Sequence, residues 1–253
     1  MPRFTDKTVI VTGAAGALGA SMVRRFAAED ARVVVGARHH EQVAGLLDEL
    51  GADRAVFAQL DVTSEQDWTA AVATAEAAFG PVSVLVNNAA RAIVGTTMSL
   101  TPDEFREVID TNLVGTFLGT RAAVPSMRRR GGGSIVNINS TAGIGTAAGL
   151  AAYGTSKWGI RGLTRISAKE LGRENIRVNG VHPGIIETPL AYDPATGELI
   201  VSIDDQPIPR LADVDEISSL VLFVASDDVG YSTGAEFVAD GGYLLGPVPA
   251  TKP

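Results

Sequence analysis

Short runs rich in β-branched residues alternate along the chain with longer segments of helical pattern. The short runs are residues 9–11, 33–35, 55–59, 84–86, 134–139 and 177–181, and the longer segments are residues 17–28, 41–50, 64–79, 101–130 and 153–171. Strands that alternate with helices pair in parallel, because each crossover helix packs back onto the sheet. The pattern therefore predicts an α/β fold of the Rossmann type, with a doubly wound parallel sheet and helices on both faces. A length of 253 residues suits one domain, residues 1–253.

Two helix starts support this division of the chain. Thr101 and Asp213 are each followed three residues later by a glutamate, the spacing of a capping box. The least regular stretch is residues 185–211, which is rich in proline and acidic residues. A loop of this length in one domain is often a lid or a binding loop, so we expect it to bind the substrate.

The charge balance excludes several classes of partner. A net charge of −8 and a pI near 4.9 argue against a nucleic-acid partner and an anionic membrane surface, since both require clustered positive charge. The one basic run, residues 128–130, precedes three glycines, where cations favour a helix C-terminus. No run approaches the roughly 20 apolar residues of a membrane span. The first residues show no apolar signal region, so we expect a cytoplasmic protein.

No metal site is expected. The chain has no cysteine, which excludes a disulfide, a thiolate nucleophile and a zinc–thiolate site. The three histidines, His39, His40 and His182, do not stand at metal-ligand spacing with acidic partners.

Tyr153 and Lys157 are the strongest candidates for chemistry. A spacing of four in a helix places the phenol and the ammonium on one face, where the cation favours the ionised phenol. Such a tyrosine can donate and accept a proton near neutral pH. The structural alternative is a chance pair on a solvated helix face.

A glycine-containing turn at residues 12–19 follows the first predicted strand. Small residues there let the backbone approach a pyrophosphate at the start of the next helix, although a plain tight turn has the same composition. The second strand ends without the acid that binds the ribose hydroxyls of NAD, and Arg38 follows it. Since an arginine at this place accommodates a 2′-phosphate, NADP(H) is favoured over NAD(H), with a merely solvated Arg38 as the alternative.

Together these motifs resemble the short-chain dehydrogenase/reductase family over nearly the whole chain. The family order is followed by the turn at residues 12–19, Asp61-Val62, the Asn87-Asn88-Ala89-Ala90 segment, Asn112, Ser140, the Tyr153 and Lys157 pair, and Pro183-Gly184. Ser140 lies thirteen residues before Tyr153, a separation common in the family. Each motif alone is weak evidence for the family, whereas their combination in this order is specific to it.

The resemblance implies a role for each matching residue. Asn112, Ser140, Tyr153 and Lys157 would be the catalytic set, with Tyr153 as acid and base, Ser140 holding the substrate oxygen, Lys157 on the nicotinamide ribose and Asn112 holding a water that links Lys157 to solvent. The cofactor-binding set would be Thr12, Gly13, Ala15, Gly16, Leu18, Gly19, Arg38, Asp61, Val62, Asn88, Ala89, Ala90, Tyr153, Lys157, Pro183, Gly184, Ile186 and Thr188. The substrate would lie against Ser140, Leu150, Tyr153, Ile186 and Leu190.

Within the family, residues 153–163, 177–184 and 240–247 look like bacterial 3α,20β-hydroxysteroid dehydrogenases. The expected reaction is hydride transfer between NAD(P)(H) and a bulky apolar secondary alcohol or ketone. A 3-oxoacyl-thioester or small-ketone reductase of the same family is the alternative substrate class. The resemblance also implies a homotetramer that packs its long central helices.

Two other function classes compete with this hypothesis. A non-catalytic NADP-binding regulator would keep the fold and would be expected to lose a catalytic group, whereas all four are present. A serine hydrolase would need a glycine where Trp158 follows the Ser156-Lys157 pair, and His182 would lack an evident partner. The sequence therefore favours an oxidoreductase.

Overall fold

The apolar runs form a single seven-stranded parallel sheet, in the order β3-β2-β1-β4-β5-β6-β7. The structure is a computed structural model that describes residues 2–193 and 196–248, so residues 194–195 of the predicted substrate loop lie outside it. The strands are β1 (Thr8–Thr12), β2 (Arg32–Ala37), β3 (Ala55–Gln59), β4 (Val82–Asn87), β5 (Gly133–Ile138), β6 (Ile176–Pro183) and β7 (Glu236–Ala239).

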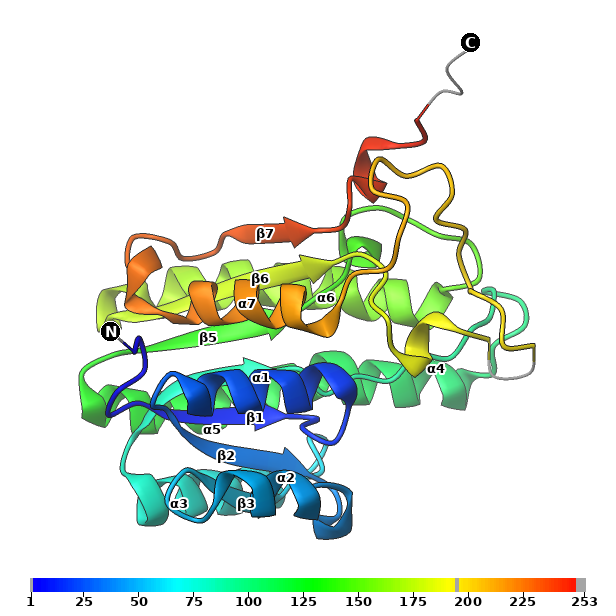
Figure 1. Ribbon diagram of the computed structural model, residues 1–253. Coiled ribbons are helices and arrows are strands. Elements are labelled where there is room, and N and C mark those ends of the chain that lie inside the picture. The colour runs from blue at the N-terminus through cyan, green and yellow to red at the C-terminus, as the bar shows by residue number, and fades with distance from the viewer. Residues whose placement is uncertain (1, 194–195, 249–253) are drawn as a thin grey trace.

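Helices cover both faces of the sheet (Figure 1). They are α1 (Ala17–Ala28), α2 (Ala44–Leu50), α3 (Glu65–Phe79), α4 (Pro102–Ile109), α5 (Gly115–Arg130), α6 (Ala151–Leu171) and α7 (Val214–Ala225). Helices α1, α2 and α7 pack on one face, and α3, α5 and α6 pack on the other. This arrangement confirms the predicted fold class.

Burial on both faces explains why the strands are continuously apolar. Val9 and Val11 of β1 join the core cluster beneath α1 and α7, whereas Ile10 between them joins the cluster beneath α3 and α5. All three side chains are fully buried. A parallel sheet covered on both faces requires this pattern, because successive side chains point to opposite sides.

Most predicted helices are present, with differences at particular boundaries. Both capping boxes are confirmed, at Thr101 with Glu104 and at Asp213 with Glu216. The segment 41–50 divides into a 3₁₀ turn, His40–Gln42, and α2. The edge strand β7 was not predicted, because its four residues are mostly half-exposed and form no buried apolar run.

The long helix expected over residues 101–130 contains a π-helical turn, Asp110–Val114, between α4 and α5. Asn112 lies in this turn and is fully buried. π turns inside helices are frequent at functional sites. The turn therefore marks Asn112 as a structurally special position.

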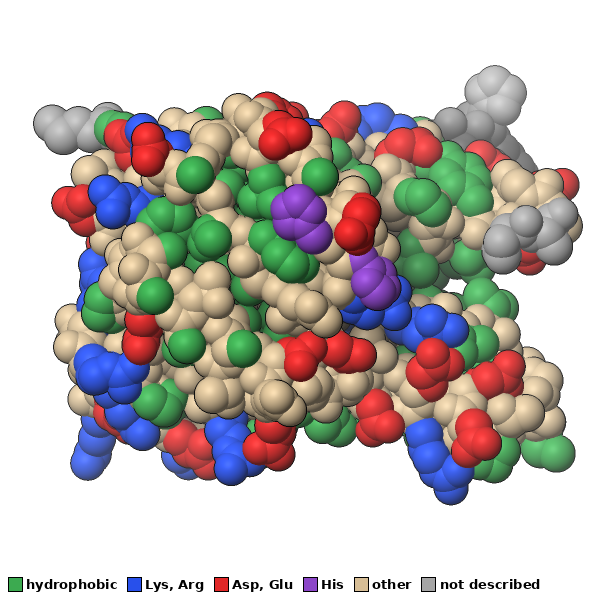
Figure 2. Space-filling view, turned by 90° about the horizontal axis from the view of Figure 1, so that it is seen from below, with side chains coloured by type: hydrophobic (Ala, Val, Ile, Leu, Met, Phe, Trp, Pro, Cys, Tyr) green, Lys and Arg blue, Asp and Glu red, His purple; other side chains and the backbone are tan. Residues whose placement is uncertain are grey.

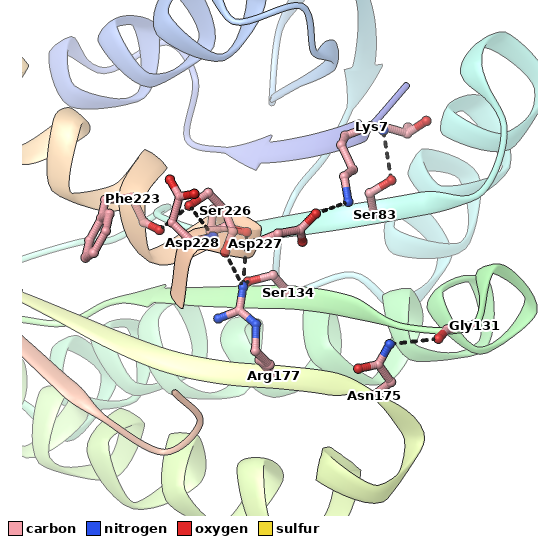
Figure 3. Close-up of polar contacts among 12 residues, drawn as sticks. Lys7, Ser83, Gly131, Ser134, Asn175, Arg177, Phe223, Ser226, Asp227 and Asp228 are labelled. Atoms are coloured by element: carbon pink, nitrogen blue, oxygen red, sulfur yellow. Dashed lines mark hydrogen bonds and ion pairs between the residues drawn. The ribbon is translucent and has the colours of Figure 1, made fainter. Parts of the chain in front are cut away.

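At the amino ends of β5 and β6, Arg177 ties α7 to the sheet (Figure 3). Its guanidinium donates to the carbonyl oxygens of Val224, Ala225 and Ser226, at 3.2, 3.3 and 2.8 Å, and to Ser134 Oγ at 3.1 Å. Helix C-termini leave carbonyls without intrahelical partners, and a cation satisfies them well. Arg177 therefore anchors the C-terminal end of α7 at this end of the sheet.

The face shown in Figure 2 interleaves acidic and basic side chains. Such mixing is typical of a solvated protein surface. Among the described residues, no helix has both the length and the apolar character that crossing a membrane demands.

Candidate active site

The carboxyl ends of the strands border an open cleft of about 1830 Å³. The molecule is visibly hollowed on this side, at the right-hand edge of Figure 2. Open α/β sheets bind ligands where the strand order reverses, which here lies between β1 and β4. Pockets for one small ligand measure roughly 300–1,000 Å³, so this cleft has room for a dinucleotide and a second molecule.

A tight turn between β1 and α1 forms one wall of the cleft. Gly13 has φ +63°, and a methyl group added to it would lie 2.8 Å from Ala89 Cα. At Gly19 such a group would lie 2.3 Å from the Gly13 oxygen. Helix α1 begins after Gly16 without a side-chain cap or an acid in its first turn. Its free N–H groups and dipole therefore suit a pyrophosphate.

Arg38 and Asp61 lie at the end of the cleft beside β2 and β3. The Thr63 hydroxyl and N–H donate to Asp61 Oδ1 at 2.7 and 2.9 Å, and they hold the pKa of Asp61 below its usual value. The positive charge of Arg38 lowers that pKa further. Arg38 is exposed and makes no hydrogen bond or ion pair with other described residues. Its guanidinium is therefore available to a ligand.

Thr12 lies behind the cleft and does not line it. Its hydroxyl accepts the N–H groups of Asn88 and Ala89 at 2.9 and 3.0 Å. The Asn88 side chain in turn donates to the Thr12 carbonyl at 2.9 Å. Thr12 thus holds the loop after β4, while Asn88, Ala89 and Ala90 face the cleft.

Ser140, Tyr153 and Lys157 meet in the cleft at the end of β5. Ser140 follows that strand, and the other two residues stand one turn apart on α6. The Ser140 hydroxyl lies near enough to the Tyr153 phenol to lower its pKa. Lys157 is 3% exposed, and its Nζ donates to the Ile138 carbonyl at 2.8 Å. The same nitrogen lies 5.4 Å from the centre of the Tyr153 ring.

Burial dominates the protonation of this pair. It raises the pKa of the Tyr153 phenol above its ordinary value, although the nearby Ser140 hydroxyl opposes the rise. Burial also lowers the pKa of Lys157 from 10.5 to about 8. We expected Lys157 to lower the pKa of Tyr153, whereas burial in this structure raises it. The phenol is a proton donor in its resting form.

Asn112 is near these residues without lining the cleft. Its Oδ1 accepts the Arg91 N–H at 2.8 Å, and its Nδ2 donates to the Arg91 carbonyl and to Ser156 Oγ, both at 2.9 Å. The Ser156 hydroxyl donates to the Tyr153 carbonyl at 2.7 Å. Asn112 therefore joins the π turn, the loop after β4 and α6, which makes it a positioning residue in this structure.

The remaining predicted residues lie along the cleft after β6 and before α6. Pro183, Gly184, Ile186 and Thr188 line it, as do Leu150 and Leu190. Gly184 packs so closely that an added methyl group would lie 2.8 Å from Asp240 Cα, and its N–H donates to the Ala239 carbonyl at 2.9 Å. The backbone there is held in place by β7.

A family model described as short chain dehydrogenase matches residues 7–197. The chain belongs to the short-chain dehydrogenase/reductase family. It is accordingly an oxidoreductase that acts on CH–OH donors, as the motifs predicted.

Relatives of this dehydrogenase match it over nearly its full length. A 3-alpha-(or 20-beta)-hydroxysteroid dehydrogenase of Mycobacterium tuberculosis is 43% identical over 244 residues, which are 96% of this chain and 92% of the relative. A trans-4-hydroxycyclohexanecarboxylate dehydrogenase of Sinomonas cyclohexanicum is 42% identical over 252 residues, covering 96% of this chain and 95% of the relative. The crystal structure of a Burkholderia xenovorans protein assigned to this family superposes with a TM-score of 0.90 at 32% identity, over 98% of this chain and 100% of that one.

The structure of this dehydrogenase adds cleft residues that the motifs did not indicate. Ile93 and Val94 lie three and four residues after the 87–90 motif, so their apolar character was a usable signal. The C-terminal residues Tyr243, Leu244, Gly246 and Pro247 also line the cleft, as do Asn139 and Gln206. Gln206 lies within the predicted substrate loop, and Asn139 directly precedes Ser140. The tertiary structure is needed to show that the C-terminal segment reaches the cleft.

Proposed function

We propose that this protein transfers hydride between NADP(H) and a bulky, apolar secondary alcohol or ketone. The observation that carries the proposal is the meeting of Ser140, Tyr153 and Lys157 in a cleft large enough for a dinucleotide and a substrate. When bound, the nicotinamide supplies the hydride for reduction and accepts it in oxidation. Residues of the chain transfer the proton and bind the substrate oxygen.

In reduction, the Tyr153 hydroxyl gives its proton to the carbonyl oxygen as hydride reaches the carbonyl carbon. The Ser140 hydroxyl donates a hydrogen bond to the same oxygen, where negative charge develops. Oxidation reverses both transfers, with the Tyr153 phenolate taking the alcohol proton. Lys157 would hold the cofactor ribose through its ammonium group.

Arg38 supports NADP(H) over NAD(H). Its guanidinium is exposed at the cleft without an internal partner, which suits a 2′-phosphate. Asp61 beside it is held ionised and belongs to the adenosine end of the site. NAD(H) stays the alternative, since the same cleft accommodates it.

The proposed substrate class follows from the apolar side chains that line the same cleft as Tyr153. Val94, Leu150, Leu190 and Leu244 line the cleft from four separate segments. The relatives named for a hydroxysteroid and a hydroxycyclohexane carboxylate act on cyclic secondary alcohols, which supports the same class here. Residues 185–211 would select among such substrates, with a 3-oxoacyl thioester or a small ketone as the alternative.

Tyr153→Phe tests the reaction. The variant keeps the ring and loses the proton donor, so kcat for ketone reduction should fall by ~10² or more on the scale of general acid catalysis, with NADPH binding retained. Turnover is followed by NADPH absorbance and binding by NADPH fluorescence. Tyr231→Phe is the matched control, because Tyr231 is fully exposed.

Near-normal turnover by Tyr153→Phe would refute the assignment of the acid. If the wild-type protein bound NADPH but reduced no ketone in a panel of cyclic and open-chain ketones, a non-catalytic regulator would be supported instead.

A further inference from the structure

Gln206 is a buried polar side chain inside the segment 185–211. It is 8% exposed, whereas Asp205 and Pro207 on either side of it are exposed. It lines the same cleft as Ser140 and Tyr153. A glutamine is seldom buried without a reason, since its amide must leave water.

The Gln206 carboxamide has no hydrogen-bond partner among the described residues. The one fully buried side-chain nitrogen or oxygen without a partner in that part of the chain is Asn139 Nδ2. The amide atoms of Gln206 are therefore not sealed inside the protein, and they reach the cleft that the side chain lines. A largely desolvated amide that lines a ligand cleft and has no protein partner is ready to bind a polar group there.

The backbone around Gln206 is held in place by the C-terminal segment. The Ile208 N–H donates to the Gly241 carbonyl at 2.9 Å, and the Val248 N–H donates to the Asp205 carbonyl at 2.8 Å. The Gln206 N–H donates to the Ile203 carbonyl at 3.1 Å. Its Oε1 lies beside Gly241, 3.6 Å from the position that a methyl group on that glycine would take. The side chain is thereby presented from an anchored position, which lowers the entropy cost of binding.

The chemistry at Tyr153 leaves this amide without a role. In the proposed reaction Ser140 and Tyr153 bind the oxygen that gains or loses a proton, and Gln206 lines the same cleft without a part in that step. A carboxamide both donates and accepts hydrogen bonds, so it can bind a hydroxyl or a carboxylate oxygen.

We infer that Gln206 is a specificity-determining residue that binds a second oxygen of the substrate, remote from the carbon that exchanges hydride. The preferred substrate class is then an apolar, cyclic secondary alcohol or ketone that carries a further hydroxyl or carboxylate. This inference rests on the proposed function and narrows its substrate class.

The test compares two pairs of ketones that differ in one remote group. The first pair is 5α-androstan-3-one and its 17β-hydroxy derivative, and the second is cyclohexanone and 4-oxocyclohexanecarboxylate. The ratio of kcat/KM within each pair is measured with NADPH for the wild type and for Gln206→Leu. The wild type should prefer the oxygen-bearing member of at least one pair by about tenfold, and Gln206→Leu should remove that preference while keeping activity on the simpler ketone.

Gln206→Glu separates hydrogen bonding from packing. A glutamate keeps the length and the acceptors, so it should retain the preference for the hydroxyl and lose any preference for the carboxylate, which it repels. Gln66→Leu, on the exposed side of α3, is the matched control and should leave both ratios unchanged.

Equal ratios in the wild type and Gln206→Leu for both pairs would overturn the inference and leave the proposed function standing. A wild-type enzyme that reduces none of the four ketones would overturn the proposed function, and this inference with it. Unfolding of Gln206→Leu would be recognised by circular dichroism, and Gln206→Glu then decides between the outcomes. A lower ratio for the carboxylate pair would support the inference, and unchanged ratios for both pairs would overturn it.

Discussion

Lys157 illustrates how one side chain can be costly for the fold and useful for the site. Its ammonium is almost completely removed from water, and its one hydrogen bond in the described structure goes to the Ile138 carbonyl. Burial lowers its pKa to about 8, so at neutral pH the protein keeps a buried cation. A neighbouring anion or ribose hydroxyl would relieve that cost.

Lys157→Met should change how stability depends on pH. The folded-state pKa lies below the unfolded value of 10.5, so below about pH 8 both states are protonated and the lysine costs about 3 kcal/mol. Between pH 8 and 10.5 the folded protein releases this proton and the cost disappears. The stability of Lys157→Met relative to the wild type should therefore fall as pH rises through this window.

Urea unfolding at pH 7, 8, 9 and 10 measures that difference for the two proteins. Loss of the hydrogen bond to Ile138 shifts all four values alike, so it does not affect the trend. A difference of the same size at pH 7 and pH 10 would contradict the prediction.

Arg38→Ala should affect the KM for NADPH and the KM for NADH differently. If the guanidinium binds a 2′-phosphate through charge-assisted hydrogen bonds, the KM for NADPH should rise by at least about tenfold and that for NADH should change little. Steady-state kinetics with both cofactors provides the measurement, and Arg173→Ala, exposed beyond the end of α6, is the control. An equal effect on both cofactors would show that Arg38 is a surface residue without contact to the phosphate.

At the scale of elements, close packing between helices determines where the site residues stand. Helix α5 approaches α3 and β4 through Gly119, where a methyl group would lie 2.5 Å from Asn87 Oδ1 and 2.6 Å from the Trp68 ring. Asn87 ends β4, directly before the loop that faces the cleft. The packing of α5 thereby positions the 88–90 loop.

Gly119→Ala should lower the free energy of unfolding by about 1–3 kcal/mol, because it overfills this contact. Gly162→Ala on α6 is the matched control, since Gly162 is exposed and a methyl group there meets nothing within 4 Å. The free energy of unfolding of Gly162→Ala should rise by roughly 0.5–1 kcal/mol, because the substitution lowers the backbone entropy of the unfolded chain. Urea unfolding of both variants checks the signs, and a stabilised Gly119→Ala would contradict the packing argument.

At the scale of the whole molecule, exposed apolar side chains gather on the layer formed by α4, α5 and α6. Phe105, Phe117, Trp158 and Ile166 are 37%, 47%, 45% and 58% exposed. Helices α4 and α6 are in contact, so these side chains belong to neighbouring elements on one face of the sheet. Apolar area of this kind favours association, in agreement with the homotetramer that the family resemblance implies.

We therefore expect the wild type to sediment as a tetramer and Phe117→Asp to sediment as a smaller species. A buried carboxylate without a partner would destabilise the interface. Ala70→Asp, on the exposed side of α3, is the control and should leave the sedimentation coefficient unchanged. A monomeric wild type, or a Phe117→Asp protein that remains a tetramer, would contradict this expectation.

The sequence by itself determined the fold class and the identity of the candidate acid. Parallel strands buried on both faces must be apolar throughout, and residues four apart on a helix must share a side, so these features follow from local periodicity. The edge strand β7 was missed, because its half-exposed residues carry neither signal.

Only the tertiary structure decided the surroundings of those residues. Burial reversed the expected direction of the Tyr153 pKa. A π turn occurs where one continuous helix was predicted, and Asn112 within it contacts Arg91 and Ser156. Thr12 lies behind the cleft, where its hydroxyl holds the loop after β4. Gln206 lines the cleft, and hydrogen bonds to the C-terminal segment hold the backbone beside it. Desolvation and hydrogen bonding depend on segments that are distant in the chain, so no local pattern could encode them.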